Sequence, residues 1–253
     1  MTKLCPSVAE WRALRNSPEW AGRSVGFVPT MGALHAGHEA LLARARAENE
    51  RVVLSVFVNP TQFNEPNDLA RYPRTLEADI ELARPHADAV FAPAPEEFYP
   101  DGYRYRVTEN ELSRRWEGAH RPGHFDGVLT VVLKLFNAVQ PTRAYFGEKD
   151  WQQLQLVRGM AAALLLPVDV VACPTVRDAD GLALSSRNRR LSAPARRRAA
   201  EFPRVLRTAA DAATAAAELR AAGFEVDYVD DTAGVRLGAV RLDGVRLIDN
   251  VRI

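Results

Sequence analysis

The chain has 253 residues, of which 47% are hydrophobic and 26% are charged, as expected for a globular protein with a large core. Its 33 basic and 32 acidic residues give a formal net charge of +1, which gives no support to nucleic-acid binding. The longest apolar runs, 52–58 and 161–166, are too short to cross a bilayer, and the N-terminus has no apolar signal core. Cys5 and Cys173 are isolated, so we expect a cytoplasmic protein with no membrane partner.

Strands alternate with helices over the first two thirds of the chain. Ser7 and Glu10 form a capping box before a short helix. The apolar runs 24–28 and 51–58 predict buried strands, and an amphipathic helix begins near Gly37 between them. Further predicted elements are helices at 75–84, 125–139 and 151–165, and strands at 89–92, 143–146 and 168–173. This order predicts an α/β fold, a parallel sheet with helices on both faces.

The composition changes after residue 174. Residues 175–190 are polar, 193–222 are rich in Ala and Arg and predict helix, and 224–253 contain short alternating segments. We therefore expect a first domain at 1–174 and a small α+β domain at 175–253. Within it, the loop 178–184 has little apolar content and is expected to be mobile without nucleotide. The three basic residues Arg196, Arg197 and Arg198 are interpreted as a solvated helix face.

Three polar loops follow predicted strands. They contain HAGH at 35–38, NPTQF at 59–63 and GEKD at 147–150. In parallel sheets, ligands bind at the carboxyl ends of the strands, so these loops predict one site. The first loop leads into a helix, whose N-terminal N–H groups and dipole suit phosphate.

HAGH resembles the HxGH signature of the nucleotidyltransferase superfamily. The alternative is a loop histidine, His35, followed by a helix-capping histidine, His38. A metal site is less favoured because no further ligand cluster supports it. His120 and His124 do not share a helix face, since Pro122 and Gly123 lie between them.

Taken together, the motifs resemble those of the pantothenate synthetase (pantoate–β-alanine ligase) family. They occur in the family's order: PTMGALHAGH at 29–38, FVNPTQF at 57–63, YPRT at 72–75, RPGHFDGVLTVV at 121–132, FGEKDWQQ at 146–153, PTVRDADGLALSSRN at 174–188 and RLIDN at 246–250. The resemblance implies ATP-dependent condensation of pantoate with β-alanine through pantoyl adenylate, releasing AMP and pyrophosphate. It also implies a Rossmann-like doubly wound domain, a C-terminal lid over ATP, Mg²⁺ and a homodimer.

The resemblance also assigns roles to individual residues. The catalytic residues would be His35, His38, Lys149, Ser185, Ser186 and Arg187, with His38 as proton donor. ATP would bind Met31, Gly32, Ala33, Leu34, His35, Ala36, Gly37, His38, Gly147, Glu148, Lys149, Asp150, Val176, Leu184, Ser185, Ser186 and Arg187. Pantoate and β-alanine would bind Met31, Asn59, Gln62 and Gln153, and Asp150 would contact Mg²⁺. Lys149 could instead be a solvated loop lysine, and Asp150 with Gln153 also fits a helix cap.

The chain departs from the family pattern in three places. Leu184 stands where Met is frequent, Asp126 stands where a small residue is common, and the C-terminal domain is short. Two other functions remain open from the residues. One is a nucleotidyltransferase that transfers AMP to a phosphate, which would not need NPTQF together with GEKDWQQ. The other is a non-catalytic nucleotide- or RNA-binding relative, against which the retained histidines and serine loop argue.

Overall fold

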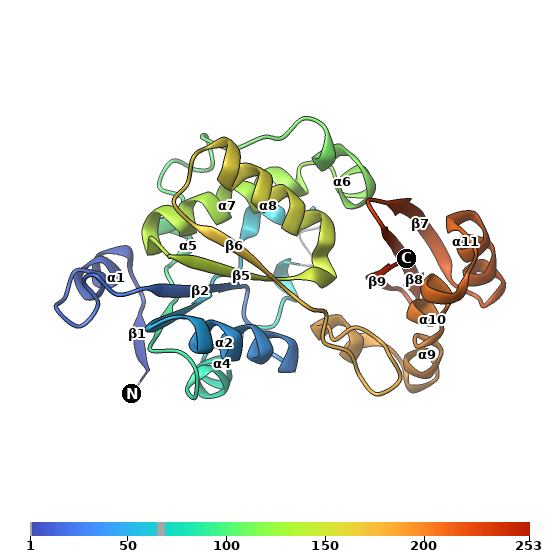
Figure 1. The fold of residues 1–253 in the computed structure, drawn as a ribbon, viewed down its shortest axis with the longest axis horizontal. Helices are drawn as coiled ribbons and strands as arrows, with labels where there is room; N and C mark the ends of the chain where they lie inside the picture. The colour runs from blue at the N-terminus through green and yellow to red at the C-terminus, as the bar shows by residue number, and fades with distance from the viewer. Residues whose placement is uncertain (1, 65–68) are drawn as a thin grey trace. The chain divides into compact units, whose positions relative to one another are not determined.

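The structure, a computed structural model, describes residues 2–64 and 69–253 (Figure 1). Contacts divide the chain into two units. Unit 1 comprises Met1–Gly147 and Gln152–Cys173, and unit 2 comprises Glu148–Trp151 and Pro174–Ile253. The short segment Glu148–Trp151 thus groups with the C-terminal part of the chain, whereas the sequence places it in the first domain.

Unit 1 is built on a six-stranded parallel sheet with the strand order β1-β4-β3-β2-β5-β6. The strands are β1 (Lys3–Cys5), β2 (Val25–Thr30), β3 (Arg51–Val56), β4 (Ala89–Phe91), β5 (Arg143–Gly147) and β6 (Asp169–Cys173). The predicted parallel sheet is confirmed. The edge strand β1 was not predicted, because three residues are too few to show a period.

Helices cover both faces of this sheet. The α-helices of unit 1 are α1 (Val8–Arg15), α2 (Ala36–Glu48), α4 (Leu76–Ala83), α5 (Pro95–Phe98), α6 (Trp116–His120), α7 (His124–Val139) and α8 (Trp151–Ala163). Helices α2 and α4 lie on one face, and α7 and α8 lie on the other (Figure 1). As predicted, His120 and His124 belong to different helices.

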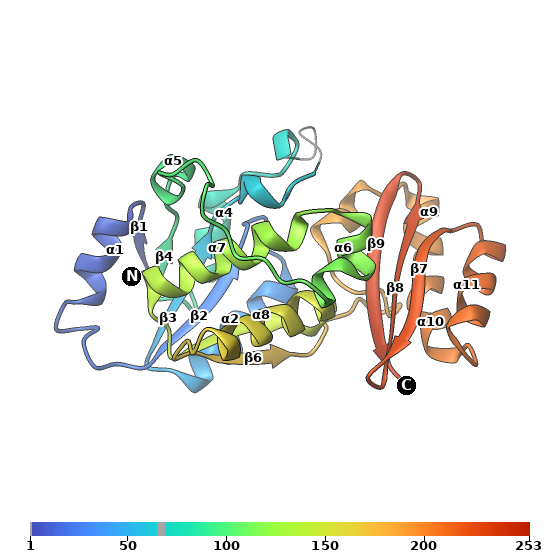
Figure 2. The same ribbon diagram turned by 90° about the horizontal axis from the view of Figure 1, so that it is seen from above.

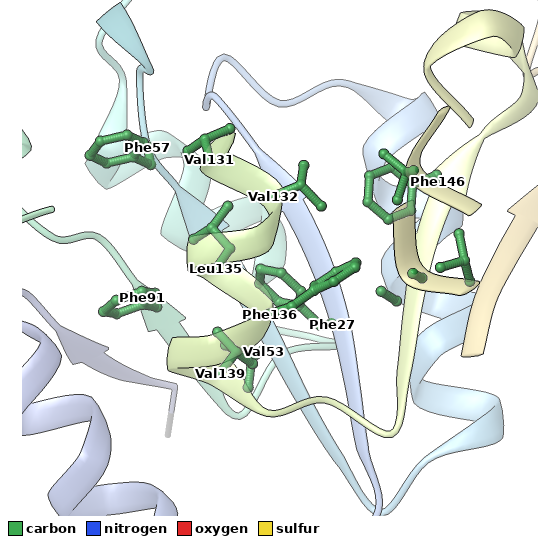
Figure 3. Packing of buried hydrophobic residues seen from close by; sticks show 14 of the residues in the cluster. Phe27, Val53, Phe57, Phe91, Val131, Val132, Leu135, Phe136, Val139 and Phe146 are labelled. Carbon is green, nitrogen blue, oxygen red and sulfur yellow. The ribbon is translucent and has the colours of Figure 1, made fainter. Parts of the chain in front are cut away.

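Helix α7 supplies much of the core on its side of the sheet. Its apolar residues recur at helical spacing and pack onto strand side chains such as Phe27 and Phe91 (Figure 3). The α7 side chains drawn there are Val131, Val132, Leu135, Phe136 and Val139, none more than 6% exposed. Burial of this stripe fixes α7, whose first turns lie beside the 3₁₀ turn η1 (Pro60–Gln62).

Unit 2 contains a three-stranded antiparallel sheet in the order β7-β8-β9. Its strands are β7 (Glu225–Thr232), β8 (Val235–Leu242) and β9 (Val245–Arg252). They are longer than predicted, because two-residue turns with positive φ at Ala233-Gly234 and Asp243-Gly244 join them directly. Helices α10 and α11 pack on one face of this sheet (Figure 2).

The single helical stretch predicted at 193–222 is three helices: α9 (Ala193–Arg198), α10 (Glu201–Thr208) and α11 (Ala212–Ala221). Composition alone does not show the breaks. Asp211 starts α11 as its N-cap, accepting a hydrogen bond from the Thr214 N–H at 2.7 Å. Ala209, which ends α10, already has extended backbone angles.

The polar segment before the serine pair is a turn with several anchors. The Asp178 N–H donates to the Leu182 carbonyl at 2.8 Å, and Leu182 is 2% exposed. Arg196 forms ion pairs with Asp178 (2.6 Å) and Asp180 (2.5 Å). Its hydrogen bond to Asp180 holds the pKa of that carboxyl below its usual value. The prediction of a solvated basic face is therefore wrong for Arg196, whereas Arg197 and Arg198 are exposed.

No helix among residues 2–64 and 69–253 combines the length and apolar character that a membrane span requires.

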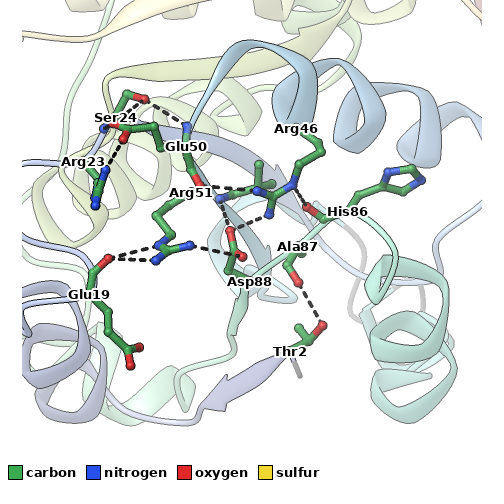
Figure 4. Close-up of polar contacts among 11 residues, drawn as sticks. Thr2, Glu19, Arg23, Ser24, Arg46, Glu50, Arg51, His86, Ala87 and Asp88 are labelled. Carbon is green, nitrogen blue, oxygen red and sulfur yellow. Dashed lines mark hydrogen bonds and ion pairs between the residues drawn. The ribbon is translucent and has the colours of Figure 1, made fainter.

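An ion-pair network lies at the amino ends of the unit 1 strands (Figure 4). Asp88 accepts a hydrogen bond from the Val52 N–H at 2.8 Å and pairs with Arg46 at 2.5 Å. Arg46 also donates to the His86 carbonyl at 2.9 Å. Asp88 thus joins the start of β3 to α2.

We expect Asp88→Ala to lower the free energy of unfolding by about 2 kcal/mol, because it leaves a backbone N–H and a guanidinium without their acceptor. Urea denaturation measures this loss. Glu81→Gln is the control, since its pair with Arg84 is 64% and 57% exposed and should contribute less than about 0.5 kcal/mol. Equal losses in the two variants would contradict a special role for Asp88.

Candidate active site

The strand order of unit 1 reverses at β2. Strands β3 and β4 extend the sheet to one side of β2, and β5 and β6 extend it to the other. Phe27 pairs with Ala144, and this register brings the end of β2 at Thr30 level with the end of β5 at Gly147. Parallel α/β sheets bind ligands at such a reversal, beyond the carboxyl ends of the strands.

The loop that leaves β2 is shaped by a buried carboxylate on α4. Asp79 is 2% exposed and accepts hydrogen bonds from the N–H groups of Ala33 (3.1 Å) and Leu34 (2.8 Å). Gly32 has a φ of +80°, and a Cβ there would lie 2.8 Å from Asp79 Oδ2. Gly32 is therefore required both by its backbone angle and by this close approach.

Sequence reasoning missed Asp79. The available signal was its place three residues after Leu76 and four before Ala83, which puts a carboxylate on a helix face expected to be buried. Thr75 also donates its hydroxyl to Asp79 at 3.2 Å. Asp79 thus accepts three hydrogen bonds within the protein. Two of them fix the backbone that precedes the histidines.

The two histidines cap α2 with one ring nitrogen each. The Gly37 N–H donates to His35 Nδ1 at 3.1 Å, and the His35 N–H donates to His38 Nδ1 at 3.3 Å. Because each Nδ1 accepts a hydrogen bond, the neutral ring carries its proton on Nε2. The rings lie with centroids 4.1 Å apart. The capping geometry therefore sets two Nε2–H donors at the positive end of the helix dipole.

The second polar loop brings three predicted pantoate residues together. Gln62, in η1, donates from Nε2 to Met31 Sδ at 3.1 Å. Asn59 is 1% exposed and donates to Gln62 Oε1 and to the Gly127 carbonyl, each at 3.1 Å. Its Oδ1 accepts from the Tyr99 hydroxyl at 2.8 Å. Burial raises the pKa of Tyr99 to about 12, so this hydroxyl keeps its proton.

Residues of the RPGHFDG motif contact the backbone of Gln62. His124 Nδ1 lies 2.9 Å from the Gln62 carbonyl, which also accepts a hydrogen bond from Arg121 at 3.2 Å. A Cβ on Gly127 would lie 2.5 Å from the Thr61 carbonyl oxygen. Because Gly127 has no Cβ, α7 and η1 can approach each other closely at this position. The neighbouring Asp126, a departure from the family pattern, lies in the first turn of α7, where a carboxylate suits the helix dipole.

The other predicted pantoate glutamine, Gln153, lies in the first turn of α8. Its neighbour Gln152 is 4% exposed and ties α8 to α6 and to the chain before α6. Gln152 Nε2 donates to the carbonyls of Leu112 (2.7 Å) and Arg115 (2.8 Å), and Oε1 accepts from the Glu117 N–H at 3.0 Å. Residues 112–127 thus support both glutamines, Gln62 directly and Gln153 through its neighbour.

Of the remaining predicted residues, Gly147 ends β5 in unit 1, and the others lie in unit 2. Lys149 and Asp150 belong to the 3₁₀ turn η3 (Glu148–Asp150), with Lys149 Nζ 3.8 Å from Asp150 Oδ1. Ser185 is the N-cap of the 3₁₀ helix η4 (Ser186–Arg190) and accepts from the Arg187 N–H at 3.3 Å. The Leu184 N–H donates to the Val176 carbonyl at 2.9 Å, so these two predicted ATP contacts are paired.

No group of three or more His, Cys, Asp or Glu side chains suited to a metal ion occurs within the part of the chain that the structure describes. A metal held chiefly by substrate oxygens would need fewer protein ligands.

Comparison with known proteins shows one family over the whole chain. The profile of the family Pantoate-beta-alanine ligase matches residues 3–252. A pantothenate synthetase from Bdellovibrio bacteriovorus is 54% identical over 254 residues, with 100% of both chains covered. One from Legionella pneumophila strain Corby is 50% identical, covering 95% of this chain and 96% of the relative.

Solved structures agree with this result. A crystal structure of pantothenate synthetase from Thermus thermophilus has a TM-score of 0.91 at 47% identity and covers 99% of both chains. A pantoate-beta-alanine ligase from Francisella tularensis, complexed with beta-gamma ATP and beta-alanine, has a TM-score of 0.93 at 38% identity. It covers 100% of this chain and 98% of its own.

The Gly127 contact can be tested directly. We expect Gly127→Ala to displace η1, lowering the free energy of unfolding by about 1–3 kcal/mol through overpacking. If Gln62 binds pantoate, as the sequence predicts, the variant should also weaken pantoate binding roughly tenfold, because Gln62 moves. Calorimetry measures both quantities. Gly159→Ala on α8 is the control: nothing lies within 4 Å of its Cβ, so the variant should be slightly more stable. Unchanged pantoate affinity in Gly127→Ala would contradict the proposal that packing of α7 against η1 positions Gln62.

Proposed function

Because this chain belongs to the pantoate-beta-alanine ligase family, and so forms pantothenate from pantoate, β-alanine and ATP through an adenylate, we propose that His35, His38, Gln62 and Gln153 are its central unit 1 residues. The observation that carries the proposal is the fixed orientation of the two histidines. Their Nδ1 atoms cap α2, so each neutral ring presents its Nε2–H group as the donor for phosphate.

In the first step, a pantoate carboxylate oxygen attacks the α-phosphorus of ATP. A P–O bond forms, and the bond from that phosphorus to pyrophosphate breaks. Negative charge grows on the phosphate oxygens, so the step needs preorganised donors more than a strong base. We assign this role to the Nε2–H groups of His35 and His38, with His38 donating toward the departing pyrophosphate. The N-terminus of α2 and the backbone of residues 31–37 complete the proposed ATP contacts.

Pantoate carries hydroxyl and carboxylate groups, and an amide side chain can both donate to and accept from them. We therefore assign pantoate to Gln62 and Gln153, with Met31 beside Gln62. Asn59 has a different part in this scheme. It is 1% exposed and its polar atoms are engaged within the protein, so it acts on pantoate by orienting Gln62.

We assign the nucleotide phosphates also to Lys149, Ser185, Ser186 and Arg187. Lysine meets phosphate as a mobile point charge, and arginine as a two-pronged donor. Gly147, Glu148, Val176 and Leu184 are proposed as backbone neighbours of the nucleotide. The Asp150 carboxylate would hold Mg²⁺, together with phosphate oxygens from the substrate. When bound, Mg²⁺ would neutralise part of the negative charge of the phosphates.

In the second step, the amine of β-alanine attacks the carbonyl carbon of the adenylate. A C–N bond forms, the C–O bond to AMP breaks, and the amine loses a proton. The adenylate is a reactive anhydride, so the site must exclude water until the amine arrives.

We also propose a cytoplasmic location and a homodimer. The location suits Cys5 and Cys173, which are both buried thiols. Sedimentation equilibrium decides the oligomeric state: a single species at about the 28.0 kDa of one chain would contradict the dimer.

The two half-reactions should separate. Pantoate and Mg-ATP alone should support exchange of labelled pyrophosphate into ATP, because the adenylate forms before the amine attacks. The measurement also separates the two other functions considered, since a transferase onto phosphate and a non-catalytic relative show no pantoate-dependent exchange. An exchange that requires β-alanine would contradict the two-step order.

His38→Ala should slow adenylation by about 10²–10³-fold, the usual effect of losing one preorganised transition-state donor. The variant also loses one cap acceptor, so its free energy of unfolding should fall by only about 1 kcal/mol. Single-turnover kinetics and urea denaturation measure the two effects. His86→Ala, which removes a histidine at the amino edge of the sheet, is the control. Near wild-type adenylation in folded His38→Ala would remove His38 from the mechanism.

A further inference from the structure

The RLIDN motif near the C-terminus has no part in the scheme above. Its last two residues, Asp249 and Asn250, are consecutive in β9. Successive side chains of a strand point to opposite faces, so the two can hold different segments of unit 2. Each contacts a segment that leads to proposed phosphate-binding residues.

Asn250 holds the turn that carries Lys149. Its Nδ2 donates to the carbonyls of Glu148 (2.8 Å) and Lys149 (3.0 Å). One amide group thus satisfies two successive backbone acceptors of η3. A side chain with a single donor could not satisfy both in this way. The backbone position of Lys149 is therefore set by β9 as well as by its neighbours in the chain.

Asp249 holds the segment that leads to the serine pair. It is 3% exposed and accepts hydrogen bonds from both terminal nitrogens of the Arg177 guanidinium, Nη1 at 2.6 Å and Nη2 at 2.9 Å. Arg177 also donates to the Gly181 carbonyl at 3.0 Å and to the Asn250 carbonyl at 2.9 Å. Backbone pairing of Arg177 with Ala183 closes the turn just before Ser185.

We propose that Asp249 and Asn250 form a positioning pair, which sets Lys149 and the Ser185–Arg187 segment in one frame built on β9. The inference rests on the proposed function for the roles of those residues. The charge pattern supports it: the Asp249 carboxylate is fully paired with Arg177, so it anchors the turn while its charge is neutralised. Neither member touches substrate in this scheme, and both act through the backbone of the residues they hold.

The chain offers a matched pair of variants. Asn250→Ala removes both hydrogen bonds to η3. Arg252→Ala, two residues along the same strand, removes an ion pair of 3.5 Å to the Glu148 side chain of the same turn. Arg252 is 85% exposed, so its pair should contribute little. Comparing the two variants separates the effect of losing hydrogen bonds to the η3 backbone from the effect of losing a side-chain contact with the same turn.

We expect Asn250→Ala to lower kcat/KM for ATP in pyrophosphate exchange by roughly tenfold to a hundredfold, the effect of about 1 Å of misplacement. Pantoate affinity and the melting temperature should stay close to wild type. Arg252→Ala should match wild type throughout. Backbone amides of residues 148–151 should exchange hydrogen faster in Asn250→Ala than in Arg252→Ala, a readout that does not depend on activity.

A double-mutant cycle tests whether Asn250 acts through Lys149. The loss in Lys149→Ala with Asn250→Ala should be little larger than in Lys149→Ala alone, because residues of one network are not additive. Additive losses would overturn the inference, as would equal hydrogen exchange in the two single variants. For Asp249, Arg177→Lys keeps the charge but loses the two-pronged contact, and should raise exchange over 178–188. Unchanged exchange there would overturn the Asp249 half.

Failure of the inference can be told from failure of the proposed function. A wild-type chain without pantoate-dependent exchange contradicts the proposed function and the inference with it. An active wild type whose Asn250→Ala variant behaves like Arg252→Ala contradicts the inference alone.

Discussion

The parallel pairing of β2 with β3 on one side and β5 on the other is the constraint on which unit 1 depends. It puts the ends of three strands at one edge of the sheet, and each end leads into a polar loop or turn. The pairing is possible because β2 and β3 are apolar on both faces and are covered by helices on each side.

The loops themselves are held by buried or half-buried side chains that bind backbone groups. Asp79 binds the N–H groups after β2, Asn59 binds the Gly127 carbonyl, and Asn250 binds the carbonyls of η3. Buried polar groups are costly unless satisfied, so Asp79 and Asn59 each favour one loop conformation strongly over others. Such anchoring supplies the preorganisation that charge stabilisation at a transition state requires.

The sequence predicted the parallel sheet, most helices of unit 1 and the loops of the candidate site, because periodicity and motif spacing are local properties. It missed what depends on distant partners. From the sequence, Asp79 is indistinguishable from a solvent-exposed helix carboxylate. Its role appears only when the loop after β2 is seen to donate its N–H groups to it. The requirement for glycine at position 127 becomes apparent only in the structure, where η1 lies against α7. Arg196 looks solvated in a run of three arginines, yet it binds two carboxylates sixteen and eighteen residues away. Whether the predicted residues bind substrate stays a prediction.

The histidine alternatives also change once the geometry is known. The sequence sets two roles against phosphate binding, a loop histidine for His35 and a helix-capping histidine for His38, as if one excluded the other. In the structure the cap uses Nδ1, and using it there fixes the proton on Nε2. Capping is therefore the means by which each ring becomes a donor of defined direction. A lysine at the same position could donate to phosphate but could not accept the helix N–H, which gives a physical reason for histidine at a helix start.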